Sequence, residues 1–268
     1  MLNNNEEIKI VFVGRDNDFN RGIIKWLNNN FKLLYVYFID KNSHKIHTIF
    51  KILIKRINRL GLFHVLDELL FRLFYFLFIR LKDKHLWIKK LPKQFTAGIN
   101  VECANHSTDN IHGKMELDKI RNLKPDIIFS VCTNTIFKKE LFNIPKYGMF
   151  MLHEGITPEY KGLHTIIWSI LKKEYKYFGY TFLKIDERLD GGSILCQNSF
   201  PDAREFGLCW GTGGHLALLH GLPDVKNSIK KLKLNNGNFQ EVSQLGRIQN
   251  IYSWVTFSEF FKLFILKK

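Results

Sequence analysis

Short apolar runs and a helical stretch alternate along the start of the chain. Residues 7–14 and 32–39 are rich in β-branched and aromatic residues, and the stretch between them, 21–29, has helical character. Strands that alternate with helices are typical of βαβ units, whose strands lie parallel in one sheet. The sequence therefore predicts an α/β fold. Its first turn, from Gly14, lacks the GxGxxG dinucleotide fingerprint, so Asp40 is better read as a loop residue than as a ribose ligand.

The pattern changes to helix over residues 45–93. Apolar residues recur there at spacings of three and four, with lysine, arginine and phenylalanine between them. Helices this apolar usually pack into a core or against a partner. Interleaved basic and aromatic residues are also typical of helices that lie on a membrane surface. The pattern thus predicts a basic helical insert after the second strand and leaves both interpretations open.

Alternating strands and helices resume after the insert. We expect strands at 98–103, 125–132, 147–152 and 179–185, and helices at 113–123, 136–142 and 164–174. After Phe200 only two short helices, 215–220 and 225–232, are indicated, and a flexible turn at 211–215 is favoured over a phosphate contact. We therefore expect one α/β domain over residues 1–205 and a C-terminal extension over 206–268 that is not a separate β-barrel.

The charge of the chain is uneven. Of a formal net charge of +15 in 268 residues, residues 41–100 contribute 13 lysines and arginines against three acids. Such a segment suits an anionic membrane, phosphorylated substrates or nucleic acid. An AT-rich genome, whose proteins drift towards lysine, is the competing explanation.

Two further features narrow the class. The longest apolar run, 73–79, is far shorter than the roughly 20 residues that span a bilayer. The four cysteines form no CxxC pair, so neither a disulfide framework nor a zinc site is expected. With no visible secretory signal, we expect a cytoplasmic protein, with peripheral membrane association as the alternative.

The candidate chemistry gathers around one histidine. His153 follows an expected strand, and ligand sites in α/β sheets form at the carboxyl ends of strands. Thr157-Pro158 indicates a fixed turn, and Asp190 precedes Gly191-Gly192, where the backbone can approach a ligand. An imidazole near a carboxylate suits general acid–base catalysis, although a structural histidine is the commoner case.

Two motifs together resemble a known family. His-Glu-Gly-Ile-Thr-Pro-Glu-Tyr-Lys-Gly at 153–162 and Leu-Asp-Gly-Gly at 189–192 are similar to the signature of 10-formyltetrahydrofolate-dependent formyltransferases. The resemblance covers residues 120–200 well. It implies a Rossmann-like open, mostly parallel sheet, 10-formyltetrahydrofolate as formyl donor and no metal.

The resemblance also implies roles for individual residues. His153 and Asp190 match the catalytic pair. The folate site would lie in the loops that follow two strands, with Asn134, Thr135, Phe137, Asp186, Leu189 and Gly191, and substrate-binding residues would be Thr157, Tyr160 and Lys161.

Met151 departs from the family pattern, which has asparagine there to hold the oxyanion. Methionine has no donor, and the loss of one oxyanion donor typically costs about 10²–10³ in rate. Asn134 or Thr157 could substitute, protonated His153 could suffice, or the protein could bind without efficient transfer. Gly191 replaces the threonine of the family and is a minor change.

The acceptor is the least determined part. The absence of a run of strands after Phe200 and of a glycine-rich phosphate loop favours an anionic amino sugar nucleotide of polysaccharide biosynthesis as the acceptor. A non-catalytic binding protein and a methionyl-tRNA formyltransferase-like activity are the alternatives. Nucleic acid is not an expected partner, whereas an anionic membrane contacted by residues 45–90 and a homodimer are both open.

Overall fold

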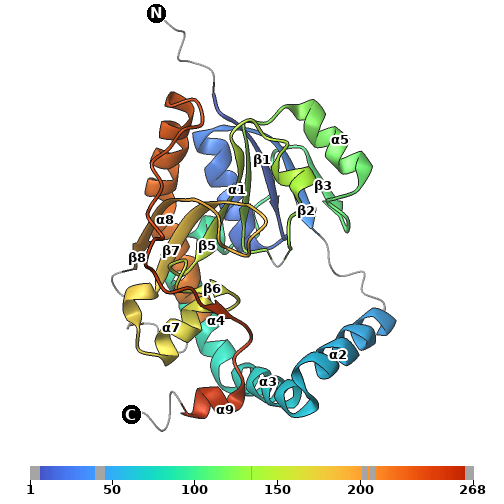
Figure 1. Ribbon diagram of the computed structural model, residues 1–268, viewed down its shortest axis with the longest axis vertical. Helices are drawn as coiled ribbons and strands as arrows, with labels where there is room; N and C mark the ends of the chain where they lie inside the picture. Colours follow the sequence, from blue (N-terminus) through green and yellow to red (C-terminus); the bar gives the residue numbers. More distant parts are fainter. Residues whose placement is uncertain (1–6, 40–45, 134, 201–204, 206–208, 263–268) are drawn as a thin grey trace, which may run out of the picture.

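The centre of the protein is a twisted sheet in the order β3-β2-β1-β4-β5-β7-β8 (Figure 1). The computed structural model describes residues 7–39, 46–133, 135–200, 205 and 209–262. The pairings from β3 to β5 are parallel, and β7 and β8 add two antiparallel pairings. The strands are β1 (Lys9–Gly14), β2 (Lys32–Ile39), β3 (Asn105–Thr108), β4 (Ile127–Val131), β5 (Gly148–Glu154), β7 (Gly179–Lys184) and β8 (Ile194–Ser199). The predicted Rossmann-like, mostly parallel α/β fold is confirmed.

Helices cover both faces of this sheet, and each face has its own apolar cluster. Helices α1 (Asp18–Asn30) and α8 (Trp210–Leu234) pack on the face that carries Phe12, Phe129 and Phe150. Helices α5 (Lys114–Leu123) and α6 (Lys139–Phe142) pack on the other face. Because both faces are covered, the central strands read as continuous apolar runs.

The sequence pattern did not predict the two edge strands of the sheet correctly. The strand expected at 98–103 is wrong: the chain pairs with β2 only at β3, whose Asn-His-Ser-Thr sequence is mostly exposed. The half-polar strand β8 was not anticipated. An edge strand needs little apolar surface, so backbone pairing decides its position and the period-2 signal is lost.

The insert is helical, as predicted. It consists of α2 (Ile46–Leu60), α3 (Leu62–Phe74), a π-helical turn (Tyr75–Ile79) and α4 (Arg80–Lys90), and it ends in the 3₁₀ turn Lys93–Phe95. None of the helices in the described residues is long and apolar enough to span a membrane.

The buried side chain of Asp83 fastens the insert to the start of α8. Its carboxylate accepts hydrogen bonds from the amides of Gly211 (3.2 Å) and Thr212 (3.0 Å), the Thr212 hydroxyl (2.6 Å) and the Tyr75 hydroxyl (3.1 Å). A carboxylate is favoured at a helix N-terminus because unpaired amides and the helix dipole meet it there. Residues 211–215 are therefore the first turn of a helix that already holds an internal anion, which corrects the expectation of a flexible turn.

Helix α8 is one element where the sequence indicated two. It runs through Pro223, which removes one helical hydrogen bond. Packing on the sheet offsets this loss: a Cβ at Gly221 would lie 2.5 Å from the Tyr180 ring, and the Tyr180 hydroxyl donates to Asp224. Close contact with the sheet thus keeps the helix continuous.

A second, smaller core lies beside the sheet, where the insert and the end of the chain meet. Its members come from α3, from α7 (Thr165–Leu171), from the 154–162 turn and from α9 (Phe257–Phe260). The 3₁₀ turn Tyr175–Tyr177 borders it, and β6 (Lys161–Gly162) pairs there with β9 (Ile251–Tyr252). The C-terminal segment therefore packs directly against the turn that follows β5.

We expect Asp83→Ala to lower the free energy of unfolding by about 2–4 kcal/mol, because it removes a charged acceptor from two helix amides and two hydroxyls. Urea denaturation followed by circular dichroism measures the change. Asp118→Ala is the matched control, since Asp118 is half exposed and its ion pair is with Arg121 on the surface; its effect should stay within about 0.5 kcal/mol. Equal losses in the two variants would contradict the anchoring role of Asp83.

Because of His215, the free energy of unfolding should also decrease as the pH falls. Burial lowers the pKa of His215 from 6.5 to about 4. The imidazole therefore binds a proton below about pH 6.5 in the unfolded chain but only below about pH 4 in the folded chain. The free energy of unfolding consequently decreases as the pH falls from about 6.5 to about 4. Replacement by phenylalanine should reduce the loss between pH 7 and 5 by about 1–2 kcal/mol, measured by urea titrations at both pH values. A pH dependence equal to that of the wild type in His215→Phe would refute this origin.

Candidate active site

His153 lies near the carboxyl end of β5, between two different neighbours. Strand β5 pairs in parallel with β4 and antiparallel with β7, where His153 stands opposite Thr181. The His153 side chain is only 8% exposed. A central strand thus presents a nearly buried imidazole at the edge of the sheet where α/β proteins bind ligands.

The backbone of the following turn fixes the imidazole. Nε2 of His153 lies 3.1 Å from the carbonyl oxygen of Tyr160. A carbonyl only accepts, so this contact assigns the proton to Nε2. Nδ1 is then the nitrogen that is free to accept a proton, and it faces Oδ2 of Asp190 at 4.0 Å.

Asp190 reaches the histidine from the connection between β7 and β8. Its backbone is left-handed (φ 43°), a conformation that aspartate tolerates better than most residues. Oδ2 accepts a hydrogen bond from the Gly162 amide at 2.9 Å. Gly162 itself has φ 95°, and a Cβ there would lie 2.3 Å from the Tyr252 carbonyl oxygen, so only glycine fits between β9 and Asp190.

Arg247, ninety residues from Thr157 along the chain, clamps the turn that follows the histidine. Its guanidinium donates to both carboxylate oxygens of Glu159 (2.9 and 2.6 Å) and to the carbonyl oxygen of Thr157 (2.7 Å). The Thr157–Pro158 peptide bond is cis, and the Thr157 amide donates to Thr181 Oγ1 at 3.1 Å. Arg247 was not identified from the sequence. The one signal for it was Glu159, an acidic residue of the 153–162 motif that needs a cationic partner.

The side chains of Tyr160 and Lys161 have internal partners. The Tyr160 hydroxyl donates to Glu174, and its ring stacks on Tyr252 at 4.7 Å. The Lys161 ammonium donates to Gln249 at 3.0 Å. Their predicted substrate-binding roles stay predictions; the contact that the structure gives Tyr160 within the site is its carbonyl, on His153.

Met151 lies on the same face of β5 as His153, two residues earlier. In the sheet register it stands beside Ser130 of β4. The Ser130 and Thr157 hydroxyls are buried and have no hydrogen-bond partner among the described residues. Two free hydroxyl donors thus lie on residues that adjoin Met151 and the site turn, and Ser130 was not identified from the sequence.

The residues predicted to hold folate are spread over two loops. Asn134 lies outside the described residues, as does Asp40. In the loop after β4, the Thr135 hydroxyl is buried without a partner among described residues, and Phe137 is buried against the α5–α6 face.

In the loop before β8 the predicted folate residues have varied surroundings. Asp186 accepts two hydrogen bonds from the Arg188 guanidinium, and Leu189 is half exposed. A Cβ at Gly191 would lie 2.9 Å from the Cβ of Arg188, so a threonine there would require the loop to shift. Folate binding by these residues remains a prediction.

Two other titratable groups border this region without joining the pair. Glu154 follows His153 but points to the opposite face of the sheet, towards Gly214 of α8, and burial raises its pKa. Burial, together with the charge of Arg72, lowers the pKa of His164 to about 4. His153 and Asp190 therefore remain the pair that the fold brings together on the active face.

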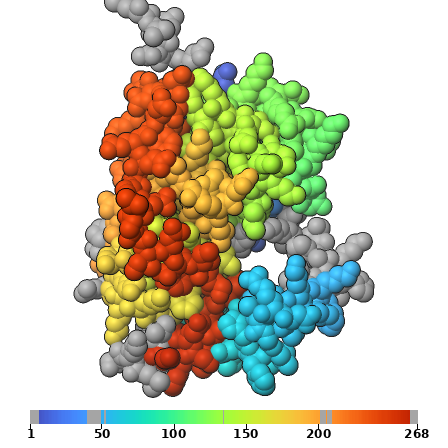
Figure 2. All heavy atoms as spheres, viewed as in Figure 1, coloured from blue at the N-terminus to red at the C-terminus, as the bar shows by residue number. Residues whose placement is uncertain are grey.

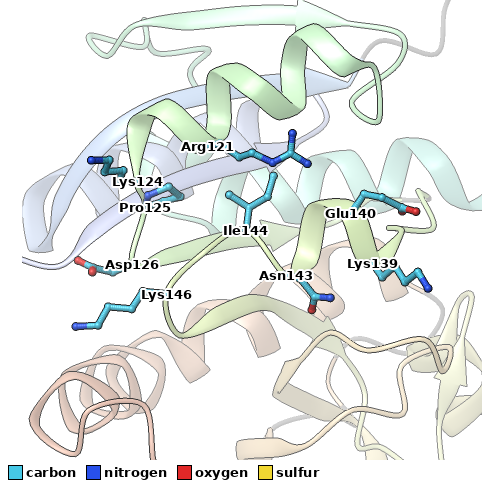
Figure 3. A pocket seen from close by; sticks show the side chains of 9 residues that line it. All are labelled: Arg121, Lys124, Pro125, Asp126, Lys139, Glu140, Asn143, Ile144 and Lys146. Atoms are coloured by element: carbon cyan, nitrogen blue, oxygen red, sulfur yellow. The ribbon is translucent and has the colours of Figure 1, made fainter.

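A hollow of about 710 Å³ lies at the opposite edge of the sheet (Figure 3). It is lined by Arg121, Lys124, Pro125, Asp126, Lys139, Glu140, Asn143, Ile144 and Lys146. Pro125 and Asp126 precede β4, so this hollow is at the amino ends of the strands and away from His153.

Comparison with known proteins agrees with this geometry. Residues 88–203 match the family model described as formyl transferase. The chain is 38% identical over 90 residues to the bifunctional polymyxin resistance protein ArnA of Wigglesworthia glossinidia brevipalpis, which covers 34% of this chain and 14% of that protein. It is 37% identical over 82 residues to methionyl-tRNA formyltransferase of Clostridium perfringens, with coverages of 31% and 26%. The chain thus matches only a small part of the length of these relatives.

Solved structures share the fold over most of the chain. A sugar N-formyltransferase from a Shewanella species superposes with a TM-score of 0.53 at 16% identity, covering 91% of this chain and 76% of that one. A 4-N formyltransferase from Francisella tularensis gives 0.52 at 17% identity, with coverages of 92% and 77%. Glycinamide ribonucleotide transformylase 1 from Symbiobacterium toebii gives 0.54 at 10% identity, with coverages of 85% and 89%.

The structure thus defines an α/β protein in which His153 and Asp190 lie together at the carboxyl edge of the sheet. The matched segment makes the assignment narrower. Residues 88–203 match the formyl transferase family model, in agreement with the resemblance drawn from the 153–162 and 189–192 motifs.

Proposed function

We propose that the protein transfers a formyl group from 10-formyltetrahydrofolate to the amine of an amino sugar nucleotide. The observation that carries the proposal is the joint positioning of His153 and Asp190 by the backbone of a single turn, through the Tyr160 carbonyl and the Gly162 amide. Side chains held this way are preorganised, because neither must be ordered when substrate binds.

We infer that Nδ1 of His153 handles the proton, because Nε2 is held by the Tyr160 carbonyl and Nδ1 faces Asp190. When the amine attacks the formyl carbon, Nδ1 takes the proton that the amine loses, and Asp190 stabilises the imidazolium that results. The C–N bond to the folate then breaks, and the same proton passes to the departing nitrogen. The 4.0 Å gap between Nδ1 and Asp190 is an electrostatic contact, and such contacts commonly shorten when substrate binds.

Residues near Met151 carry hydrogen-bond donors that suit the transfer of a formyl group. The oxygen of the formyl group becomes negatively charged in the tetrahedral intermediate and requires hydrogen-bond donors. The buried hydroxyls of Ser130 and Thr157, which have no hydrogen-bond partner among the described residues, are such donors. They support turnover over binding without transfer, because they can act where Met151 cannot.

The choice of acceptor rests on the names of two solved structures and on charge. Two of the solved structures with this fold are named as sugar or 4-N formyltransferases, and a nucleotide-linked sugar is anionic, as suits a chain of charge +15. The sequence relatives include methionyl-tRNA formyltransferases, so methionyl-tRNA is the acceptor to test against it.

Purified protein should release tetrahydrofolate from 10-formyltetrahydrofolate when a nucleotide-linked amino sugar is added, as measured by absorbance with mass spectrometry of the formylated product. Methionyl-tRNA and glycinamide ribonucleotide serve as competing acceptors. Faster turnover of methionyl-tRNA would replace the sugar assignment. Folate binding without turnover of any acceptor would refute the proposal that the protein is a formyltransferase enzyme.

We expect His153→Ala to lower kcat by about 10²–10⁴, because it removes the group that moves the proton. Stopped assays under saturating donor measure this loss, and folate affinity should change little. His106→Ala, which removes an exposed histidine from strand β3, should keep the wild-type rate. A His153→Ala variant of normal activity would show that the imidazole is structural.

Met151→Asn should raise kcat by up to about 10²-fold, because it places an amide donor on the active face of β5. The Michaelis constant for the donor should change little, since the new hydrogen bond strengthens only as charge develops. Met151→Leu, which keeps the volume and adds no donor, should behave as wild type. If the asparagine and leucine variants have equal rates, a donor at this position does not limit transfer.

A further inference from the structure

An unbroken apolar stripe runs along the outer side of α3, the π turn and α4. Each member lies three or four residues from another member, so together they cover one broad helix face. All are exposed, by 45% to 78%: Leu62, Leu66, Leu69, Leu70, Leu73, Phe76, Leu77 and Leu81. Phe63 and Phe78 flank the stripe and are 87% and 71% exposed. An apolar patch of this extent is typical of a surface that contacts a partner.

The opposite side of the same helices is what attaches them to the protein. Val65, Phe71 and Ile79 are buried, and Phe71 contacts Trp210 and Phe260. In the space-filling view the insert forms the light-blue lobe at the lower right, bordered by the C-terminal segment (Figure 2). The stripe therefore points outward from a firmly attached element.

The acidic and basic side chains of the insert also differ in their surroundings. Each of its three acids has an internal partner: Glu68 pairs with Arg56, Asp83 caps α8, and Asp67 accepts the Ser258 amide at 3.1 Å. Its exposed charges are cations, among them Lys51, Lys55, Arg59, Arg80, Lys82, Lys84 and Lys89. The exposed surface of the insert thus combines apolar side chains with positive charge.

We propose that this surface, residues 62–81 with the surrounding cations, docks on an anionic phospholipid bilayer. A bilayer offers acyl chains to the leucines and phosphate headgroups to the lysines at once, as interfacial helices require. A second copy of the chain would bring the same cations to the contact and repel it. The docking is independent of the formyl transfer proposed above.

Docking would also place the active site close to the membrane. Phe71 of α3 packs in the same buried cluster as Tyr160 and Trp168, and the Tyr160 carbonyl holds His153. The turn that positions the imidazole is therefore one helix layer from the docking surface.

The test is co-sedimentation of the full chain with vesicles of phosphatidylcholine alone and of phosphatidylcholine mixed with phosphatidylglycerol. We expect binding to the mixed vesicles that weakens as salt is added. Leu66→Gln/Leu70→Gln/Leu77→Gln should weaken partitioning more than about tenfold, since each change removes apolar area from the contact. Lys82→Gln/Lys84→Gln/Lys89→Gln should weaken it by a similar factor.

Matched variants with exposed residues elsewhere control for overall hydrophobicity and charge. Met115→Gln/Leu234→Gln/Leu245→Gln and Lys114→Gln/Lys230→Gln/Lys231→Gln alter exposed positions outside the insert and should leave partitioning within about twofold. An unchanged melting temperature shows that each variant is folded.

Three results would overturn the proposal. These are no binding to mixed vesicles, equal binding to both vesicle types without salt dependence, and equal effects of insert and control variants. Sedimentation velocity without lipid adds a fourth: a dimer that becomes a monomer in the leucine variant would assign the stripe to a second copy of the chain.

Discussion

The positions of both proposed catalytic side chains, His153 and Asp190, depend on the backbone between Tyr160 and Gly162. The carbonyl of the first residue fixes the His153 ring, and the amide of the second fixes the Asp190 carboxylate. This short segment can do so because it pairs with β9 and because Gly162 adopts a backbone conformation that side chains disfavour. The site is therefore only as well ordered as the contact between the turn and the C-terminal segment.

Contacts between distant segments hold this arrangement together. Arg247 clamps the turn from the C-terminal side, and Asp83 fastens the insert to α8, which in turn covers the sheet. Each contact joins a buried or half-buried charge to groups that satisfy it, as burial of a charge requires. The insert, the sheet and the C-terminal segment consequently form one packed unit, although residues 1–87 lie outside the matched family segment.

The central elements could be predicted because buried elements leave a strong pattern. The bounds of β2 match the expected run, and α5, β4 and β5 begin and end within a few residues of their expected positions. The errors fall at edges and at α8. Strand β3 is polar and exposed, and α8 crosses Pro223 only because Gly221 allows close contact with Tyr180. Within the site, the motifs identified His153 and Asp190. Ser130 was identified only from its register beside Met151, and Arg247 only from its contact with the distant Glu159 in the folded chain.

The sequence by itself determined the alternation of strands and helices, the helical and basic character of the insert, and the resemblance of the motifs at 153–162 and 189–192 to formyltransferases. These features are local, or repeat at a fixed period, so the order of residues is enough to reveal them. The tertiary structure decided which carbonyl holds the imidazole, which amide holds the carboxylate, and which side of the insert faces outward. Those depend on contacts between residues far apart in the chain, and no local period encodes them.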